Sequence, residues 1–421
     1  MKKAITGNVE SEIGLCSRIE KWLTMVLLCL AGSLIWWLPY FQDVYYVPMQ
    51  DAFGFSNTQI GMLSGVAGFM AMLTYIPGGW VADRFPSRQL MSIALLISAM
   101  GGFIFAQVPS FEVCLVLYGL WGVSAALIFW AAMIKATRNW GGRDEQGKAF
   151  GILEGGRNLN DAVSASLFLI VFAWMGSNSE ALATNINIIS STIMLMAVLV
   201  WFVMKDTATP QSEAPVQLVA FSRVKLQGVM KMPIVWLLSL VVMMTSWGMW
   251  GTIYFTPYAT VVYELGDVWG GDVGTSKYFV ATMAAVIAGV VADRIGIAWS
   301  VLVLFIIMTA GFLMLAIVPG SPALLPLFLI IGVAMTLAVY ATRGIYYALM
   351  EQGGVPLKLT GTAVGLVSVI GYTPDWIAPV VSGFVLDAWP GATGFQILFS
   401  LISGLCFLGL AAAIIIYRKY R

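Results

Sequence analysis

The chain has 421 residues, of which 60% are hydrophobic and only 10% are charged, with a formal net charge of +1. A soluble protein carries about 25% charged residues because its surface faces water, so this composition excludes a soluble fold and favours a polytopic membrane protein. The absence of histidine excludes a His-based triad or a His metal site, and the near-neutral charge without a long basic block argues against a nucleic-acid partner.

Twelve apolar segments are each long enough to cross the ~30 Å hydrocarbon core of a bilayer, which takes about 20 helical residues. In chain order their approximate bounds are 22–47, 58–82, 89–107, 111–136, 149–175, 185–204, 233–262, 273–292, 297–318, 323–350, 359–387 and 394–417. The alternating segments of about 10 residues that build outer-membrane barrels are missing. The sequence therefore predicts an all-α membrane protein with twelve transmembrane helices.

One long polar stretch, residues 205–231, separates the sixth apolar segment from the seventh. It predicts a linker between two six-helix halves. The predicted units are an N-terminal half, a cytoplasmic linker and a C-terminal half, at residues 1–204, 205–232 and 233–421.

Basic residues lie on one side of this topology, in the N-terminus, the loops after the second and fourth spans, the linker and the C-terminal tail. The loops on the opposite side contain acidic residues but no Lys or Arg. The positive-inside rule then places both termini in the cytoplasm. The polar start of the chain has no cleavable signal-peptide pattern. We expect a multi-pass protein of a bacterial inner membrane, and a monomer.

The two predicted halves contain similar sequence motifs at corresponding positions. Residues 79–84, Gly-Trp-Val-Ala-Asp-Arg, end the second span, and residues 289–294, Gly-Val-Val-Ala-Asp-Arg, end the eighth, 210 residues later. A second match at an offset of 214 residues relates spans five and eleven and places Asp161 on Asp375. Tandem halves in a membrane protein are typical of secondary transporters, whose binding site lies between the repeats.

Residues 79–88, Gly-Trp-Val-Ala-Asp-Arg-Phe-Pro-Ser-Arg, resemble the loop signature G-x-L-A-D-R-x-G-R-R of the major facilitator superfamily. The resemblance covers the whole chain, because the span count, the central linker and the second copy at 289–294 also fit. Residues 46–50, Tyr-Val-Pro-Met-Gln, and 144–148, Asp-Glu-Gln-Gly-Lys, resemble the sugar-phosphate-permease-like branch of bacterial inner-membrane carriers.

The resemblance implies transport by alternating access of the rocker-switch type. It places Asp83 near the N-terminus of a neighbouring helix, whose dipole stabilises a carboxylate. Arg84 and Arg88 would pair with acids on adjacent loops, and together these residues would latch the outward-open state. Asp293 and Arg294 form the second, weaker copy of this gate. The alternative is that the arginines only anchor the loops on the cytoplasmic side.

Ionisable side chains inside spans cost about 2.5–3.5 kcal/mol each on insertion scales, so they are functional candidates. Span five carries Glu154, Arg157 and Asp161, whose spacing places them on one helical stripe. Burial favours a protonated carboxyl, so Asp161, its counterpart Asp375 and Glu154 are candidates for proton coupling. The alternative for Glu154 and Arg157 is a structural ion pair along the helix.

The candidate substrate contacts are cations and aromatic residues. Arg343 in span ten has no acid within a turn of its own helix, so it needs another helix, water or an anionic substrate as partner. Arg157 and Lys277 are further candidates, although Lys277 could instead hold Asp161 or Asp375. Trp250 and Tyr254 are spaced four apart in span seven and could face a substrate, unless they belong to an interfacial aromatic belt.

The leading hypothesis is a secondary carrier for a small polar solute, most simply an organic anion, driven by protons or by exchange. The first alternative is a multidrug or lipid exporter of the same superfamily, which the charges in span five disfavour. A second alternative, from another class, is a sensor with a transporter fold. We expect no enzymatic activity and no cofactor, because the sequence shows no nucleophile–base set and no metal cluster.

Overall fold

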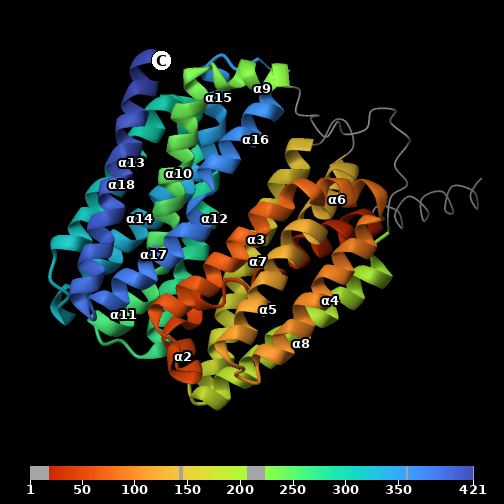
Figure 1. Cartoon of the computed structure of the whole chain (residues 1–421), viewed down its shortest axis with the longest axis vertical. Coiled ribbons are helices and arrows are strands. Elements are labelled where there is room, and N and C mark those ends of the chain that lie inside the picture. The colour runs from red at the N-terminus through yellow and green to blue at the C-terminus, as the bar shows by residue number, and fades with distance from the viewer. Residues whose placement is uncertain (1–18, 142–145, 206–222, 357–358, 421) are drawn as a thin grey trace, which may run out of the picture.

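The computed structural model describes residues 19–141, 146–205, 223–356 and 359–420. Within these residues every regular element is a helix, and each of the twelve predicted spans coincides with a continuous or broken helix (Figure 1). By length and composition, eight helices in the described ranges can cross a membrane, or ten when two bent pairs each count as one span. The structure therefore confirms the prediction of an all-α membrane protein.

The N-terminal group of helices ends at Val203. It comprises residues 19–34, α2 (Gln42–Phe53), α3 (Asn57–Arg84), α4 (Ser87–Phe105), α5 (Phe111–Val123), a π-helical segment (Ser124–Trp130), α6 (Ala131–Gly141), α7 (Gln146–Trp174) and α8 (Ser179–Val203). The first predicted span is not continuous, because residues 35–41 form turns between its two helices. α2 ends at Phe53 and is followed by Gly54, whose φ of 68° suits a residue without a Cβ atom.

The C-terminal group of helices begins at Arg223. It comprises α9 (Arg223–Met230), α10 (Pro233–Ile253), α11 (Phe255–Val262), α12 (Asp267–Ile295), α13 (Ile297–Ile317), α14 (Leu325–Ile345), α15 (Leu349–Gln352), α16 (Thr360–Gly371), α17 (Pro374–Ala388) and α18 (Ala392–Lys419). Short 3-10 turns at Pro322–Leu324 and Tyr346–Ala348 flank α14.

Prolines explain two of the breaks in predicted spans. Proline has no N–H to donate to the carbonyl four residues earlier. Pro257 therefore has no N–H for the carbonyl of Ile253 where α10 gives way to α11, and Pro374 has none for the carbonyl of Ile370 where α16 gives way to α17. The carbonyl of Ile370 accepts from Thr373 instead. These breaks place irregular backbone inside the bundle, where other helices surround it.

α3 and α12 bend at equivalent positions. α3 bends by 60° between Tyr75 and Pro77, and α12 bends by 42° between Ala284 and Ile287. Pro77 and Ile287 are 210 residues apart, which is the offset of the repeated motif at the ends of these helices. The repeat seen in the sequence thus corresponds to a repeated shape, although only one of the two bends contains a proline.

The two groups meet at one end of the bundle, where α2 carries Asp51 and α12 begins at Asp267; we call it the acidic end. There α3 packs against α17 in close backbone contact. A Cβ atom on Gly61, Gly65 or Gly68 of α3 would come within 3.0 Å of a carbonyl oxygen of α17. Only glycine allows this approach, so the two groups are tightly closed here.

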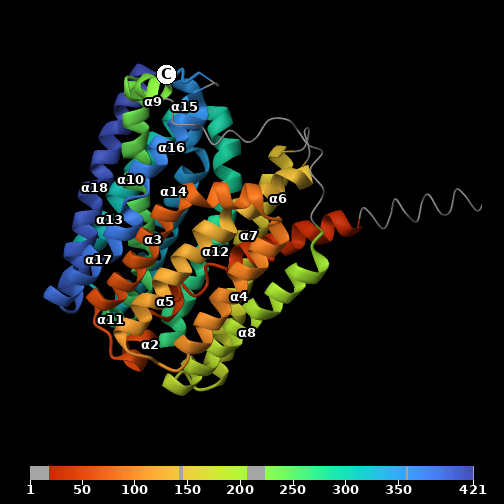
Figure 2. The same cartoon turned by 45° about the vertical axis from the view of Figure 1, so that its right-hand side comes forward.

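The groups separate toward the other end, where Arg84, Arg138 and Arg294 lie at helix termini; we call it the basic end. Leu169 of α7 lies against Gly271 of α12 near the acidic end. Gly151 lies eighteen residues earlier, about five turns along the same face of α7, and a Cβ atom there would have no atom within 4 Å. Figures 1 and 2 show the same divergence of the two helix groups toward α6 and α16.

The outer surface of the bundle is apolar. Large side chains such as Leu167, Ile170, Phe202, Ile317 and Phe384 are each more than half exposed in the isolated chain. Exposed apolar side chains at this density suit a lipid environment, where all backbone groups are already bonded within helices. The polar and charged side chains of the predicted site face inward instead.

Candidate substrate-binding site

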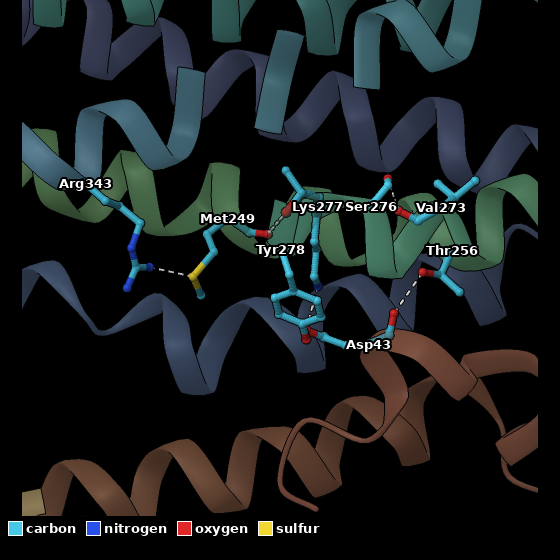
Figure 3. Close-up of polar contacts among 9 residues, drawn as sticks. Asp43, Met249, Thr256, Val273, Ser276, Lys277, Tyr278 and Arg343 are labelled. Carbon is cyan, nitrogen blue, oxygen red and sulfur yellow. Dashed lines mark hydrogen bonds and ion pairs between the residues drawn. The ribbon is translucent and has the colours of Figure 1, made fainter. Parts of the chain in front are cut away.

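Arg343 lies in the last turn of α14, in the interior of the bundle. Its guanidinium donates to the sulfur of Met249 in α10 and lies 6.0 Å from the ring centre of Tyr340. Figure 3 shows the side chain directed toward Met249. Among the described residues no carboxylate is within ion-pair distance of Arg343. Thioether sulfur is only a weak acceptor, so most of the donor capacity of this guanidinium is unused.

Arg157 projects from the middle of α7 toward the broken first span. Its Nε donates to the carbonyl oxygen of Gly32 at 3.0 Å, and its guanidinium lies 5.1 Å from the ring centre of Trp130. It also forms an ion pair of 3.0 Å with Glu154. The Glu154 side chain is 55% exposed, so the partner of Arg157 faces water. Arg157 is thus held in place by a backbone carbonyl and only partly neutralised.

Asp161 and Asp375 have different neighbours, although the repeat relates them. Asp161 accepts a hydrogen bond from the hydroxyl of Ser33, whose oxygen in turn accepts from Asn160 at 2.9 Å. Asp375 accepts from the indole N–H of Trp250 at 3.2 Å. Neither has a Lys or Arg within ion-pair distance in the described part of the chain.

Trp250 and Tyr254 point toward the C-terminal group's own α17. Trp250 is 2% exposed, binds Asp375 and stacks on Tyr40 with ring centres 6.0 Å apart. The hydroxyl of Tyr254 donates to the carbonyl oxygen of Pro379 at 3.3 Å. In this conformation Trp250 lies beside the site through its hydrogen bond to Asp375, whereas Tyr254 belongs to the closed contact at the acidic end.

Tyr75 lies in the neighbourhood of the two arginines and was not singled out from the sequence. It lies within electrostatic range of both Arg157 and Arg343, and of Asp375 and Tyr372. Tyr75 is nevertheless 45% exposed. Tyr75 of the N-terminal group thus lies near charged side chains of both helix groups. The bend of α3 beside Pro77 places it there, and that proline is the sequence signal that could have found it.

Lys277 of α12 forms a buried ion pair with Asp43. The two charged atoms are 2.6 Å apart, and the side chains are 3% and 7% exposed. The same carboxylate oxygen accepts from the hydroxyl of Tyr278 at 3.0 Å, and the backbone carbonyl of Asp43 accepts from Thr256 at 2.8 Å. Figure 3 shows this contact set apart from Arg343. Lys277 therefore holds Asp43, and neither Asp161 nor Asp375, which the sequence offered as the alternative to a substrate contact.

The residues of the predicted gate lie apart at the basic end. Arg84 stacks on Trp80, with its guanidinium 3.7 Å from the ring centre. In the described part of the chain the carboxylates of Asp83 and Asp293 have no recorded ion pair, and Arg294 is exposed. Within the described residues neither aspartate is engaged in this conformation, so the latch of Asp83, Arg84 and Arg88 stays a prediction.

The profile of the Major Facilitator Superfamily matches residues 22–374. The chain belongs to this superfamily. Members of the superfamily are transporters, so the chain is a membrane transporter and not an enzyme. As a member it is a multi-pass protein of the inner membrane, like relatives that carry this location in their names.

Relatives of this superfamily member align over nearly its whole length. Inner membrane protein YihN of Escherichia coli K12 is 28% identical over 95% of this chain and 96% of its own length. Inner membrane protein YqcE of the same organism is 28% identical over 96% of both chains. A more distant relative, probable anion transporter 2 (chloroplastic) of Oryza sativa subsp. japonica, is 22% identical over 94% of this chain and 74% of its own length.

A solved structure with the same fold is a bacterial homologue of the human lysosomal transporter Spinster, in an inward-facing and unoccupied conformation. It aligns with a TM-score of 0.76 at 15% identity, over 95% of this chain and 98% of its own. At this identity the likeness shows the fold alone. The fold of the superfamily is therefore established independently by the sequence profile and by the three-dimensional comparison.

Proposed function

We propose that this transporter is a secondary carrier for a small organic anion, which binds between the two helix groups. The observation that carries the proposal is Arg343, an interior guanidinium with no carboxylate partner among the described residues. A buried cation is costly unless it is paired. A carboxylate, sulfonate or phosphate oxygen pair would fit the planar fork of the guanidinium.

The site is built from both helix groups. Arg157 and Tyr75 come from the N-terminal group, and Arg343 and Tyr372 come from the C-terminal group, with Tyr75 in electrostatic range of the other three. A substrate between them touches both groups at once, which alternating access requires. The equivalence of α3 and α12 supports treating residues 1–204 and 233–421 as the two moving halves, joined by the linker at 205–232.

Orientation follows from the distribution of basic residues. If the basic end faces the cytoplasm, as the positive-inside rule predicts, the site opens to the cytoplasm and is closed to the periplasm by the contact of α3 with α17. Asp161 and Asp375 lie beside the two arginines without ion pairs and are the candidates for carrying a proton. Coupling to protons or exchange of one anion for another are both compatible with this arrangement.

An exporter of apolar drugs or lipids fits the site less well. An apolar ligand would leave the guanidinium of Arg343 buried without a strong acceptor, which costs binding energy. The rice relative named as a probable anion transporter also supports the anion hypothesis. No observation favours a sensor without transport.

The proposal is tested by a ligand screen on the purified protein. Thermal-shift measurements would compare carboxylates, sulfonates, sugar phosphates, amino acids and apolar cationic drugs. We expect stabilisation by one anionic class, lost in Arg343→Ala and retained in Arg418→Ala, which removes an exposed arginine in the last turn of α18. Stabilisation by apolar drugs alone, with no response to any anion, would overturn the proposal.

A further inference from the structure

The N-terminus of α3 is capped in part by Asp387, a side chain from the other helix group. An α-helix leaves its first backbone N–H groups without internal partners. In α3 a capping box satisfies two of them, because Ser56 accepts from the N–H of Gln59 and Gln59 accepts from the N–H of Ser56. The remaining N–H groups, of Asn57 and Thr58, donate to the two carboxylate oxygens of Asp387 at 3.0 and 2.7 Å.

Asp387 lies at the C-terminal end of α17, so this contact joins the two groups across the acidic end. The Asn57 side chain strengthens it, because its amide nitrogen donates to Asp387 at 2.9 Å. The amide oxygen of Asn57 accepts from Tyr46 at 2.9 Å and from Gln50 at 3.0 Å, both in α2. The carboxylate is therefore held by three donors of the N-terminal group, at a helix end whose dipole favours a negative charge.

The position of Asp387 mirrors that of Asp83. Each is the next-to-last residue of its helix, Asp83 in α3 and Asp387 in α17. The two helices run antiparallel, so Asp83 lies at the basic end, toward which α16 begins at Thr360. Asp387 is engaged, whereas Asp83 is exposed and has no hydrogen bond or ion pair to a residue that the structure describes. The closed end of the bundle is the end with the engaged carboxylate.

We propose that Asp387 is a gate residue whose contact with the N-terminus of α3 holds the acidic end closed and breaks when that end opens. The inference rests on alternating access in the proposed function but not on the identity of the substrate. Opening the acidic end would expose Asn57 and Thr58 to water, which replaces the lost acceptors. The contact therefore sets the balance between two conformations.

The gate role is separable from folding because α3 keeps its own cap. Ser56 and Gln59 belong to the same chain segment as the helix and do not depend on α17. Asp387→Asn keeps the size of the side chain but replaces one carboxylate oxygen by an amide nitrogen. This nitrogen can only donate, so it cannot accept from the backbone N–H of α3 that it faces. We expect this variant to fold and to enter the membrane while favouring the conformation open at the acidic end.

Two single-cysteine reporters measure the balance between the conformation open at the acidic end and the conformation open at the basic end. Each is placed in a background in which the four native cysteines are replaced by Ser. Ser64 is 5% exposed and shares the closed face of α3 with Gly61 and Gly68, so Ser64→Cys reports opening of the acidic end. Gly151→Cys lies in open space on α7 and reports closure of the basic end. A membrane-impermeant maleimide would be applied to intact cells and to inverted membrane vesicles.

We expect Asp387→Asn to raise the labelling rate of the Ser64→Cys reporter by about tenfold, the equivalent of one charge-assisted hydrogen bond, and to lower that of the Gly151→Cys reporter. Asp387→Glu should restore part of both rates. Asn57→Ala should shift both rates in the same directions by less. Asp272→Asn, which changes an exposed carboxylate of the acidic end, should leave both unchanged.

A loosened structure would give a different result, because both reporters would then react faster. Such a parallel increase, or unchanged rates at both reporters, would overturn the assignment of Asp387 as a gate residue. The assay uses no substrate, so a failed ligand screen would leave its outcome intact. Failure of the gate and failure of the anion hypothesis are therefore distinguishable.

Discussion

Lys277 and Asp43 form an ion pair that ties α12 to α2, and so joins the C-terminal group to the N-terminal group deep in the bundle. One carboxylate oxygen of Asp43 takes both the ammonium and the hydroxyl of Tyr278, while its other oxygen has no hydrogen-bond partner. The pair neutralises two charges that neither lipid nor protein interior would otherwise tolerate. Lys277 therefore serves the assembly of the two groups in this conformation.

This relationship predicts strong non-additivity. Lys277→Met should destabilise the protein by about 3–5 kcal/mol, because it leaves the carboxylate of Asp43 buried and unpaired. The double variant with Asp43→Asn should recover much of the loss. Thermal unfolding of the purified variants in detergent measures both. A double variant no more stable than Lys277→Met alone would contradict the pairing.

Arg343 is expected to bind substrate directly. Arg343→Lys keeps the charge but loses the planar fork, so it should raise the Kd of the anion found in the ligand screen. Arg343→Ala should weaken binding by roughly ten- to 150-fold, the effect of losing about 1.5–3 kcal/mol of charged hydrogen bonding. Calorimetric titration measures these constants, with Arg418→Ala as the matched control. If Arg343→Ala binds the anion normally, Arg343 is not the contact.

The alternative role for Arg343 is a structural one, in which it pairs with a nearby aspartate and does not contact substrate. In that case Arg343→Ala would lower the thermal stability, and a second change, Asp375→Asn, would restore both stability and substrate binding. We expect no such rescue of binding. The double variant therefore separates a substrate contact from a structural cation.

Proton coupling should be separable from substrate binding. Asp161→Asn and Asp375→Asn each keep the size of the side chain but cannot release a proton. The variant at the coupling residue should retain exchange of labelled anion across proteoliposomes and lose the response to an imposed pH gradient. If both variants still respond to the gradient, neither aspartate carries the proton.

The predicted gate at the basic end has its own test. Asp83→Asn should insert and fold normally but slow transport, because Asp83 would contact a neighbouring helix only when the basic end closes. Arg88→Ala should have the smaller effect, since an exposed ion pair contributes only about 0–1 kcal/mol. Initial transport rates at equal expression measure both. Wild-type transport by Asp83→Asn would remove Asp83 from the gate.

Topology is the simplest prediction to check. The one-sided distribution of Lys and Arg places the C-terminus in the cytoplasm and the loop at Ser177 outside it. A reporter enzyme that is active only in the cytoplasm should therefore work when fused to Arg421 and fail when fused after Ser177. The opposite pattern would reverse the assignment of the two ends of the bundle.

The sequence by itself determined the helices, the transporter family and the stripe of charges on α7. These features depend on local properties, because hydropathy over about 20 residues decides where a chain crosses a bilayer and helical spacing decides which side chains share a face. The repeated Val-Ala-Asp-Arg motif predicted two related halves, and the structure adds matching bends in α3 and α12 that the motif did not predict. The breaks in the spans were less predictable, although proline marks two of them.

Only the tertiary structure decided which charges meet. Lys277 and Asp43 are 234 residues apart, and Asp387 and Asn57 are 330 residues apart. Such pairs depend on how each helix is rotated about its axis and on which end of the bundle is closed. Neither quantity is encoded in the hydropathy of a single span. Arg343 remained without an ion pair for the same reason, because no carboxylate of the described helices comes within ion-pair distance of its guanidinium.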